Sequence, residues 1–527
     1  MKKITALLLS LALVLALLPG CDRSIDNSGY VPTGDALLGE DEEPPEATQD
    51  ADTQELTLAY YPDRSLNPLF GSDYTNRVLM SLIYQGLFAV DSKKNVTPIL
   101  CDSYRVNPRQ TTWTFYLDEN ATFSDGSKVT IQDVMASYER ARENDYYKNR
   151  FRHLLDMEIM EDGGLVFYLD TPYENFPILM DIPILKANEV EAEHPLGTGP
   201  YLFYQDASGS SLHRVGAWWC DGAKCPATDQ TITLIEVSSA AQIRDEFQFG
   251  SLSLACTNPM SANFAEYRSD YELWSVDSGY MMYIGCNVMY SDFFADGTLR
   301  TYLTYAIDRQ TLADTVYNGL VDTVTLPCSP REVYYNKTLA MQYEFDTIRF
   351  LDGLASYRMP RDEKTNGYKT MRLLVNSDDS SRVEVARDIA EMLTDLGLPC
   401  ETMERSLGTY KDVLYAANFD IYLGMTRLSP TMDMTEFFRP YGEMRWGGLS
   451  HESLYSMVKS TLENTGNFYN FHKILADDGR IIPVMFGYYN IYTQRGVLPD
   501  LAPSRDNVFY YSLGKSMKDA QLETEYN

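Results

Sequence analysis

Basic residues are scarce in this sequence of 527 amino acids. It contains 44 Lys and Arg against 75 Asp and Glu, which gives a formal net charge of -31 at pH 7. Nucleic acids and anionic lipid surfaces attract proteins through clustered positive charge. The charge balance therefore argues against nucleic acid and against an anionic lipid surface as partners, and we expect neither to be bound directly.

Long apolar runs are also missing, apart from one near the N-terminus. Lys2 and Lys3 precede residues 4–18, which are nearly all Leu, Ala, Val and Ile. A membrane-spanning helix needs about 20 such residues, so this run is short for a permanent span. A positive start, a short apolar run and then small residues are typical of a secretory signal.

The apolar run ends in Leu18-Pro19-Gly20-Cys21, which resembles the bacterial lipobox. In a lipobox the cysteine is lipidated and becomes the mature N-terminus, and several acyl chains on one residue give stable attachment. We therefore expect residues 1–21 to be a lipoprotein signal peptide and Cys21 to hold the exported protein at the outer face of the cytoplasmic membrane or in the periplasm. The alternative is an ordinary signal peptide with a chance cysteine.

Apolar residues are again scarce between Cys21 and the folded part. Residues 22–53 contain ten Asp or Glu and a single Arg. Such a segment cannot form a core, and we expect it to be a disordered acidic tether. As a random coil it would span roughly 30 Å. The globular part is expected to begin at residue 54, and the membrane is expected to be contacted through the lipid anchor only.

Motifs for catalysis are lacking as well. The five histidines are scattered, there is no H-E-x-x-H or G-x-S-x-G motif, and Gly514-Lys515-Ser516 lacks the earlier glycine of a phosphate loop because Phe509 stands there. We predict no catalytic residue, no metal ligand and no cofactor. Cys220 and Cys225 are close enough to form a disulfide in an oxidising envelope, whereas zinc binding would need further Cys or His ligands nearby.

What is present is a pattern of alternating strands and helices. Period-two alternation predicts strands at 56–60 and 113–117, and helices are predicted to start at Asp73 and Thr130, residues that can cap a helix. We expect the first of these helices to end at Gly86.

Further along, residues 371–403 have the pattern of a β-α-β unit: a strand at 371–375, a helix with one apolar face from Val383 to Leu396, and a strand from Leu398 to Met403. This alternation predicts α/β lobes with partly parallel sheets.

Five stretches, in order, resemble the family 5 extracellular solute-binding proteins, the oligopeptide, dipeptide and nickel receptors of ABC importers. The most distinctive is WTFYLDENATFSDGSKVTIQDVMASYERA, an alternating strand, a Ser-Asp-Gly turn and a capped helix. Another, HPLGTGPYLF, resembles the family's G-T-G-P-Y turn. The other three lie at 65–91, 283–312 and 480–496. In these stretches we expect Arg300 and Asp308 to be ion-paired scaffold residues.

The resemblance implies a two-lobed α/β fold of the type II periplasmic-binding-protein class, with an extra subdomain inserted in the first lobe. By this resemblance, the first lobe comprises 54–70, 196–278 and 488–527, the inserted subdomain 71–195, and the second lobe 279–487. The implied protein is a monomeric receptor that encloses a small solute or short peptide between its lobes and delivers it to the permease of an ABC importer.

Family position also suggests the ligand contacts. These are Ser72, Asp73, Tyr74, Thr257 and Asn258 on the first-lobe side, and Thr426, Arg427 and Ser429 on the second-lobe side. Two further second-lobe candidates are Asp433, which follows in the same stretch, and Trp446, an aromatic residue that could stack on an apolar group. Peptide-binding members carry a Trp and, three residues later, an Asp that pairs with the peptide amine, but here Thr426 and Ser429 occupy those positions. A neutral hydroxyl cannot replace that carboxylate as the partner of an amine, so Asp433 remains as the candidate for that role. Arg427, which lies nearby in the sequence, instead suggests an anionic group on the ligand.

Two other functions are compatible with an exported α/β protein. One is an extracellular hydrolase of peptides or glycans, which the absence of a nucleophile elbow and of a metal-ligand cluster disfavours. The other is a receptor for a metal chelate or haem, which the scattered histidines disfavour.

Overall fold

The computed structural model describes residues 55–71, 73–220, 227–261, 267, 270–511 and 517–522. The predicted signal peptide, Cys21 and the acidic tether lie outside these ranges, as do Ser72 and Cys225. Predictions about lipidation, the tether and the Cys220–Cys225 disulfide therefore stay predictions. We keep the names first lobe, inserted subdomain and second lobe for the ranges given above.

Strands and helices follow one another along the described chain. The strands are β1 (Thr57–Tyr60), β2 (Phe88–Val90), β3 (Val96–Pro98), β4 (Cys101–Val106), β5 (Thr112–Leu117), β6 (Leu154–Ile159), β7 (Leu165–Leu169), β8 (Tyr201–Asp206), β9 (Gly209–Arg214), β10 (Thr231–Glu236), β11 (Leu254–Thr257), β12 (Glu272–Cys286), β13 (Asp322–Thr323), β14 (Met371–Asn376), β15 (Cys400–Arg405), β16 (Ile421–Arg427) and β17 (Ile481–Thr493). The α-helices are α2 (Tyr74–Ile83), α3 (Ile131–Ala141), α4 (Ala240–Gln248), α5 (Thr298–Leu303), α6 (Arg309–Tyr317), α7 (Lys337–Ala340), α8 (Thr347–Ser356), α9 (Ser380–Asp395), α10 (Leu407–Tyr415), α11 (Thr435–Phe438), α12 (Glu452–Glu463), α13 (Phe468–Asp478) and α14 (Met517–Ala520).

One large sheet joins the first lobe to the second. Its strand order is β15-β14-β16-β12-β17-β11-β1-β10-β9-β8, with β13 paired to β17. The β1/β10, β14/β15 and β14/β16 pairs are parallel, whereas β12 and β17 are antiparallel to each other. The predicted mixture of parallel and antiparallel pairing is confirmed.

The long strands β12 and β17 pass from the first-lobe range into the second-lobe range. Their pairing is interrupted between Asp277 and Met281, where the register shifts. Gly279 lies in this interruption with φ of 76°, a left-handed conformation that favours glycine. The crossing between the predicted lobes therefore coincides with a local break in the sheet ladder.

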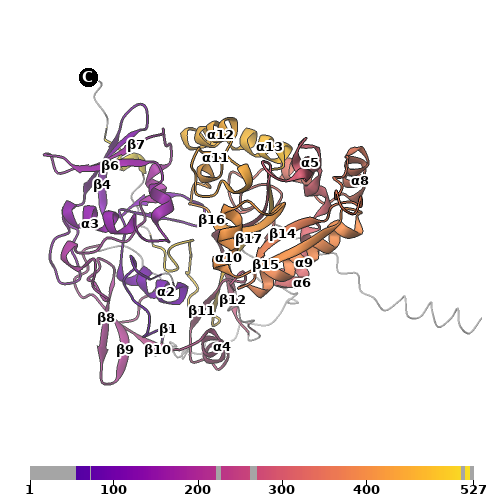
Figure 1. Cartoon of the computed structure of the whole chain (residues 1–527). Coiled ribbons are helices and arrows are strands. Elements are labelled where there is room, and N and C mark those ends of the chain that lie inside the picture. The colour runs from indigo at the N-terminus through magenta and orange to yellow at the C-terminus, as the bar shows by residue number, and fades with distance from the viewer. Residues whose placement is uncertain are drawn as a thin grey trace, which may run out of the picture. The chain divides into compact units, whose positions relative to one another are not determined.

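The sheet of the second lobe is covered on both faces. On one face, Leu373, Ile421 and Ile284 belong to a core with residues of α6 and α9. On the other face, Leu374 and Tyr422 belong to a core with residues of α10, α12 and α13. Figure 1 shows α9 beside β14 and β15, α6 next to α9, and α12 next to α13. This arrangement explains why Leu373, Leu374 and Val375 of β14 are buried in succession, as are residues 421–424 of β16.

The predicted β-α-β unit is confirmed as β14, α9 and β15, with β14 and β15 parallel and in register from Met371↔Cys400 to Asn376↔Arg405.

Of the two expected scaffold residues, Arg300 pairs with Asp478 at 3.3 Å. Asp308 instead caps α6 by accepting a hydrogen bond from the Thr311 amide at 3.1 Å. The expectation of an ion pair is therefore wrong for Asp308, whose carboxylate stabilises a helix start.

The inserted subdomain contains an antiparallel sheet of order β4-β5-β7-β6. The predicted capping residues are confirmed: Asp73 accepts from the amides of Thr75 and Asn76, and the Asp133 carboxylate accepts from the Thr130 amide at 2.8 Å. Helix α2 ends earlier than predicted, at Ile83 rather than near Gly86.

The early end of α2 is explained by the turn in HPLGTGPYLF, which packs against the end of this helix. A Cβ atom on Gly197 would lie 2.0 Å from the Ile83 carbonyl oxygen, and one on Gly199 would lie 2.4 Å from that of Leu82. Only glycine allows this approach, and the Gly199 amide donates to the Ile83 carbonyl at 2.9 Å. The turn thus satisfies the C-terminal end of α2, the helix that carries Tyr74.

Among the described residues, no helix is both long enough and apolar enough to cross a bilayer.

Candidate functional site

The first-lobe candidates lie where the chain enters α2. The Asp73 carboxylate accepts from the amides of Thr75 at 3.0 Å and Asn76 at 3.2 Å and pairs with Arg64, so it is committed to the helix start. Tyr74 stacks on Tyr489 of β17, with ring centroids 3.7 Å apart and planes at 14°. The Tyr74 hydroxyl is buried and has no hydrogen-bond partner among the described residues, which leaves it available to a ligand.

The next two candidates lie at the end of β11: Thr257 is its last residue and Asn258 follows it. Thr257 pairs in register with Asn490 of β17, and the buried Thr257 hydroxyl has no partner among the described residues. The Asn258 side chain accepts from the Met260 amide at 3.0 Å and so holds the turn after the strand. Of these two, Thr257 has the polar group that remains unsatisfied.

On the second-lobe side, Arg427 ends β16 and is held from several directions. Its Nε donates to the Ser278 carbonyl at 3.0 Å, and its Nη2 donates to the Tyr146 hydroxyl at 2.7 Å and to Asp506 Oδ1 at 2.9 Å. The guanidinium also lies 3.8 Å from the centre of the Tyr146 ring. The hydroxyl of the preceding residue, Thr426, makes a long contact with Met444 Sδ, at 3.6 Å.

Ser429 and Asp433 belong to the loop after β16, and both are buried. Ser429 Oγ lies 3.0 Å from Thr431 Oγ1. The Asp433 carboxylate lies 3.2 Å from Nε2 of His153, a residue of the inserted subdomain, and it accepts a hydrogen bond from the Thr435 amide at 2.8 Å. Burial alone would raise the pKa of Asp433, but His153 holds that pKa well below its usual range.

Trp446 is not brought together with the other candidates. Its ring meets Tyr415 edge-on at 4.7 Å, and the following residue, Gly447, lies against Asn287 beyond the end of β12. Since β12 reaches the other lobe at its opposite end, Trp446 packs within the second lobe on the side away from the crossing.

The inserted subdomain also contacts the second lobe at further points. The Tyr173 hydroxyl lies 2.6 Å from Thr431 Oγ1, and Lys94 pairs with Glu332 at 2.8 Å. The Glu174 amide donates to a carbonyl of α12 at 2.8 Å. The described chain is therefore in an arrangement in which the predicted lobes touch.

At the centre of this interface is a residue that sequence reasoning missed. Asp506 accepts from Arg150 Nη2 at 2.7 Å, from Arg427 Nη2 at 2.9 Å and from the Tyr146 hydroxyl at 2.5 Å. Burial alone would raise the pKa of Asp506, but Arg427 and Arg150 hold it far below the usual range. Arg150 also pairs with Asp181. No local motif marks Asp506, because its partners are 79 and 356 residues away along the chain.

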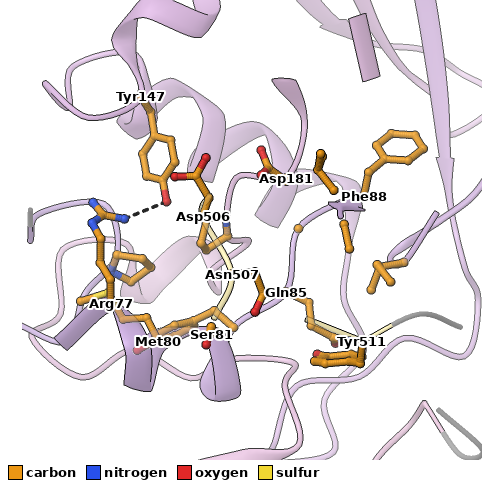
Figure 2. Close-up of a pocket in the computed structure, with 17 residues that line it drawn as sticks. Arg77, Met80, Ser81, Gln85, Phe88, Tyr147, Asp181, Asp506, Asn507 and Tyr511 are labelled. Carbon is orange, nitrogen blue, oxygen red and sulfur yellow. Dashed lines mark hydrogen bonds between the residues drawn. The ribbon is translucent and has the colours of Figure 1, made fainter. Parts of the chain in front are cut away.

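Beside Asp506 lies a pocket between α2 and residues 506–511. Figure 2 shows Asp506 next to Tyr147, whose hydroxyl accepts a hydrogen bond from Arg77 Nη1 at 3.1 Å. The pocket has about 50 Å³ of room for water-sized molecules. A buried water needs roughly 10–15 Å³ of such room, so the pocket can hold a few waters or a small chemical group but not a peptide. Its walls are Pro68, Arg77, Met80, Ser81, Tyr84, Gln85, Gly86, Phe88, Ala89, Val90, Ile99, Tyr147, Asp181, Pro183, Asp506, Asn507 and Tyr511.

One arrangement resembles the geometry of a catalytic triad. His153 Nδ1 lies 2.8 Å from Asp170, and His153 Nε2 lies 3.4 Å from the Thr435 hydroxyl. Burial alone would lower the pKa of His153, but Asp433 and Asp170 raise it to about 9. At neutral pH the imidazole is therefore protonated and cannot take a proton from Thr435, which is itself buried. The group instead links the inserted subdomain to the second lobe.

Among the residues that the structure describes, no group of three or more His, Cys, Asp or Glu side chains is placed to hold a metal ion.

Comparison with solved structures identifies the fold. NikZ from Campylobacter jejuni in complex with Ni(L-His) matches with a TM-score of 0.60 and 17% identity, covering 88% of this chain and 98% of that one. The oligopeptide-binding protein AppA from Bacillus subtilis in complex with a nonapeptide matches with a TM-score of 0.60 and 18% identity, covering 87% and 99%. The predicted α/β fold of the periplasmic-binding-protein type is confirmed.

Comparison of sequences identifies similar proteins of the same kind. The glutathione-binding protein GsiB of Shigella flexneri is 23% identical over 359 residues, which cover 65% of this chain and 68% of that protein. The model of the bacterial extracellular solute-binding proteins, family 5 Middle, matches residues 95–447.

Proposed function

Because this chain belongs to the bacterial extracellular solute-binding proteins of family 5, we propose that it captures a short peptide bearing a carboxylate between its two lobes and delivers it to the permease of an ABC importer. The binding step needs no covalent chemistry. Closure is a shift between open and closed states, and the ligand drives it through contacts that exist only when both lobes reach it.

The observation that supports a carboxylate is the convergence of Arg427 and Arg150 on Asp506. Two guanidinium groups, one from the second lobe and one from the inserted subdomain, both donate to a single carboxylate. Guanidinium and carboxylate geometries match, and such charge-assisted hydrogen bonds are among the strongest in proteins. Asp433 is less suited to an amine, since His153 already occupies it.

The ligands of the similar proteins are consistent with this class. They are glutathione for GsiB, a nonapeptide for AppA and a nickel complex of L-histidine for NikZ. All are built from amino acids and so carry carboxylates. The hydroxyls of Tyr74 and Thr257, which have no partner among the described residues, supply neutral hydrogen-bonding groups on the first-lobe side.

We further propose that Cys21 is lipidated and that the acidic tether lets the receptor reach its permease at high local concentration. The receptor acts as a monomer, held at the membrane only through its lipid.

Calorimetric titration with a peptide library tests the binding function, and Arg427→Ala tests the site. We expect Arg427→Ala to weaken binding of the best peptide by about 1.5–3 kcal/mol, the range for a hydrogen bond to a charged group. Trp446→Ala is the matched control within the second lobe and is expected to leave affinity unchanged. Equal affinity of Arg427→Ala and wild type would contradict the proposed carboxylate contact. Turnover of peptides or glycans by the pure protein would contradict the receptor function and indicate a hydrolase.

A further inference from the structure

The carboxylate of Asp506 joins three parts of the chain. Asp506 belongs to the first lobe, Arg150 and Tyr146 to the inserted subdomain, and Arg427 to the second lobe. In a receptor that closes on its ligand, such a link is normally made by the ligand itself. Here the protein's own side chain makes it.

The surroundings of Asp506 are those of a bound anion. Its side chain is 7% exposed, and those of Arg150 and Arg427 are 1% and 10% exposed. Two buried guanidinium groups and a hydroxyl on one carboxylate form a set of donors that would accept any carboxylate of similar size.

The Asp506 side chain also has an alternative position available to it, in the pocket next to α2. It lines the pocket next to α2, and Arg77 lines the same pocket. The Arg77 guanidinium lies 3.5 Å from the Tyr146 ring centre and donates to the Tyr147 hydroxyl and the Gly71 carbonyl. Its Nε is buried without a hydrogen-bond partner among the described residues. A buried donor on a charged group without a partner is costly, and the pocket provides room for a carboxylate to reach it.

We propose that Asp506 is an internal substitute for the ligand's carboxylate: a ligand carboxylate exchanges with it at Arg427 and Arg150, and Asp506 then turns into the pocket toward Arg77. This inference rests on the proposed function and deepens it. It selects solutes that carry a carboxylate over those that carry only an amine or amide. Because ligand must compete with Asp506, the measured affinity of the wild-type protein is lower than that of the vacant arginine pair.

Chemical rescue tests whether the arginine pair accepts a free carboxylate. Asp506→Ala leaves Arg150 and Arg427 facing an empty position, and we expect acetate to raise its melting temperature in a saturable way. Acetamide and chloride, at equal concentration and ionic strength, are the controls for shape and charge. Wild type, in which Asp506 occupies the position, should show no saturable response to acetate.

The double variant Arg427→Met/Asp506→Ala checks that the acetate acts at this position. It keeps the cavity but removes one guanidinium, so the saturable response should disappear. The proposal is overturned if acetate stabilises Asp506→Ala no more than acetamide does, or if the double variant responds equally. If Asp506→Ala does not fold, Asp506→Asn removes the charge at nearly constant shape and takes its place in the second measurement below.

Peptide affinity separates the exchange from a merely orienting role of Asp506, because the two predict changes of opposite sign when Asp506 is removed. Trialanine and trialanine amide are titrated into wild type and the Asp506 variant. Removal of the competitor should tighten trialanine binding by about tenfold, the lower range for a charge-assisted hydrogen bond, and leave the amide unchanged. If Asp506 only orients Arg427, trialanine binds more weakly to the variant and the proposal is wrong. Failure of every protein to bind either peptide contradicts the short-peptide function, whereas the acetate response still decides the exchange.

Discussion

The ring of His153 lies between two carboxylates, with Nε2 at 3.2 Å from Asp433 and Nδ1 at 2.8 Å from Asp170. His153 and Asp170 belong to the inserted subdomain and Asp433 to the second lobe. The side chain of the preceding residue, Arg152, donates to the Asp433 backbone carbonyl at 3.5 Å. Among the contacts between these two parts of the chain, this one depends on the charge of a histidine.

Stability should consequently depend on pH. The pKa of His153 is raised from 6.5 to about 9, so its contribution is fully present below pH 6.5 and is lost as pH rises toward 9. A shift of this size corresponds to about 3 kcal/mol at most. Melting temperatures from pH 6 to 9.5 should fall more steeply for wild type than for His153→Asn. The control is His213→Asn, which removes an exposed histidine on β9. Parallel profiles for wild type and His153→Asn would show that the contact carries no charge.

A second histidine should act in the opposite sense. His472 on α13 is fully buried beside Phe468 and Phe471, and neither ring nitrogen has a partner among the described residues. Burial lowers its pKa from 6.5 to about 3, so the unfolded chain binds a proton that the folded chain does not, and stability falls as pH drops from 6.5 toward 3.

We therefore expect His472→Phe to stabilise the protein by about 1–3 kcal/mol, since it removes buried polar atoms that lack partners. The gain should be larger at pH 5 than at pH 8, as measured by urea unfolding. A loss of stability at both pH values would mean that His472 has a partner, such as a buried water, or that the larger ring does not fit.

Gly279 offers a test of the crossing between the predicted lobes. A Cβ atom there would lie 1.6 Å from Arg505 Nη2, in addition to the strain of φ at 76°. Gly250 has a similar φ of 82° but open space around it. Gly250→Ala should cost about 1 kcal/mol from backbone strain alone. Gly279→Ala should cost more, because Arg505 must also leave its contact with the Leu428 carbonyl. Equal costs in thermal unfolding would show that Arg505 moves freely.

Lipidation can be tested without reference to the fold. Cys21→Ala should move the protein from the membrane fraction into the medium or periplasm, with its ligand affinity intact, because the tether precedes the globular part. Immunoblots of fractionated cells measure the change. Retention of the variant at the membrane would indicate that residues 4–18 remain as an uncleaved anchor.

Local features were predicted well from the sequence. The Asp73 and Thr130 helix starts and the β14-α9-β15 unit depend on residues within a few positions of one another, and the structure contains all of them. The end of α2 was placed too late, because it is set by the distant Gly197 turn.

The site was predicted less completely, for a physical reason. Arg427 was identified from family position, but its partner Asp506 lies in a segment with no recognisable pattern, and burial joins the two. Trp446 was chosen for its aromatic ring, yet the edge-on contact with Tyr415 holds it within the second lobe. Pairings between distant charged residues depend on the folded arrangement and leave no periodic signal.

Mass spectrometry of the solute that copurifies with the native protein and is released by denaturation tests the central claim most directly. The account predicts an intact short peptide that carries a carboxylate, in a stoichiometric amount, and its rebinding to the refolded protein without chemical change. A protein that releases no peptide, binds none from a library, or converts the added peptide into products would contradict it.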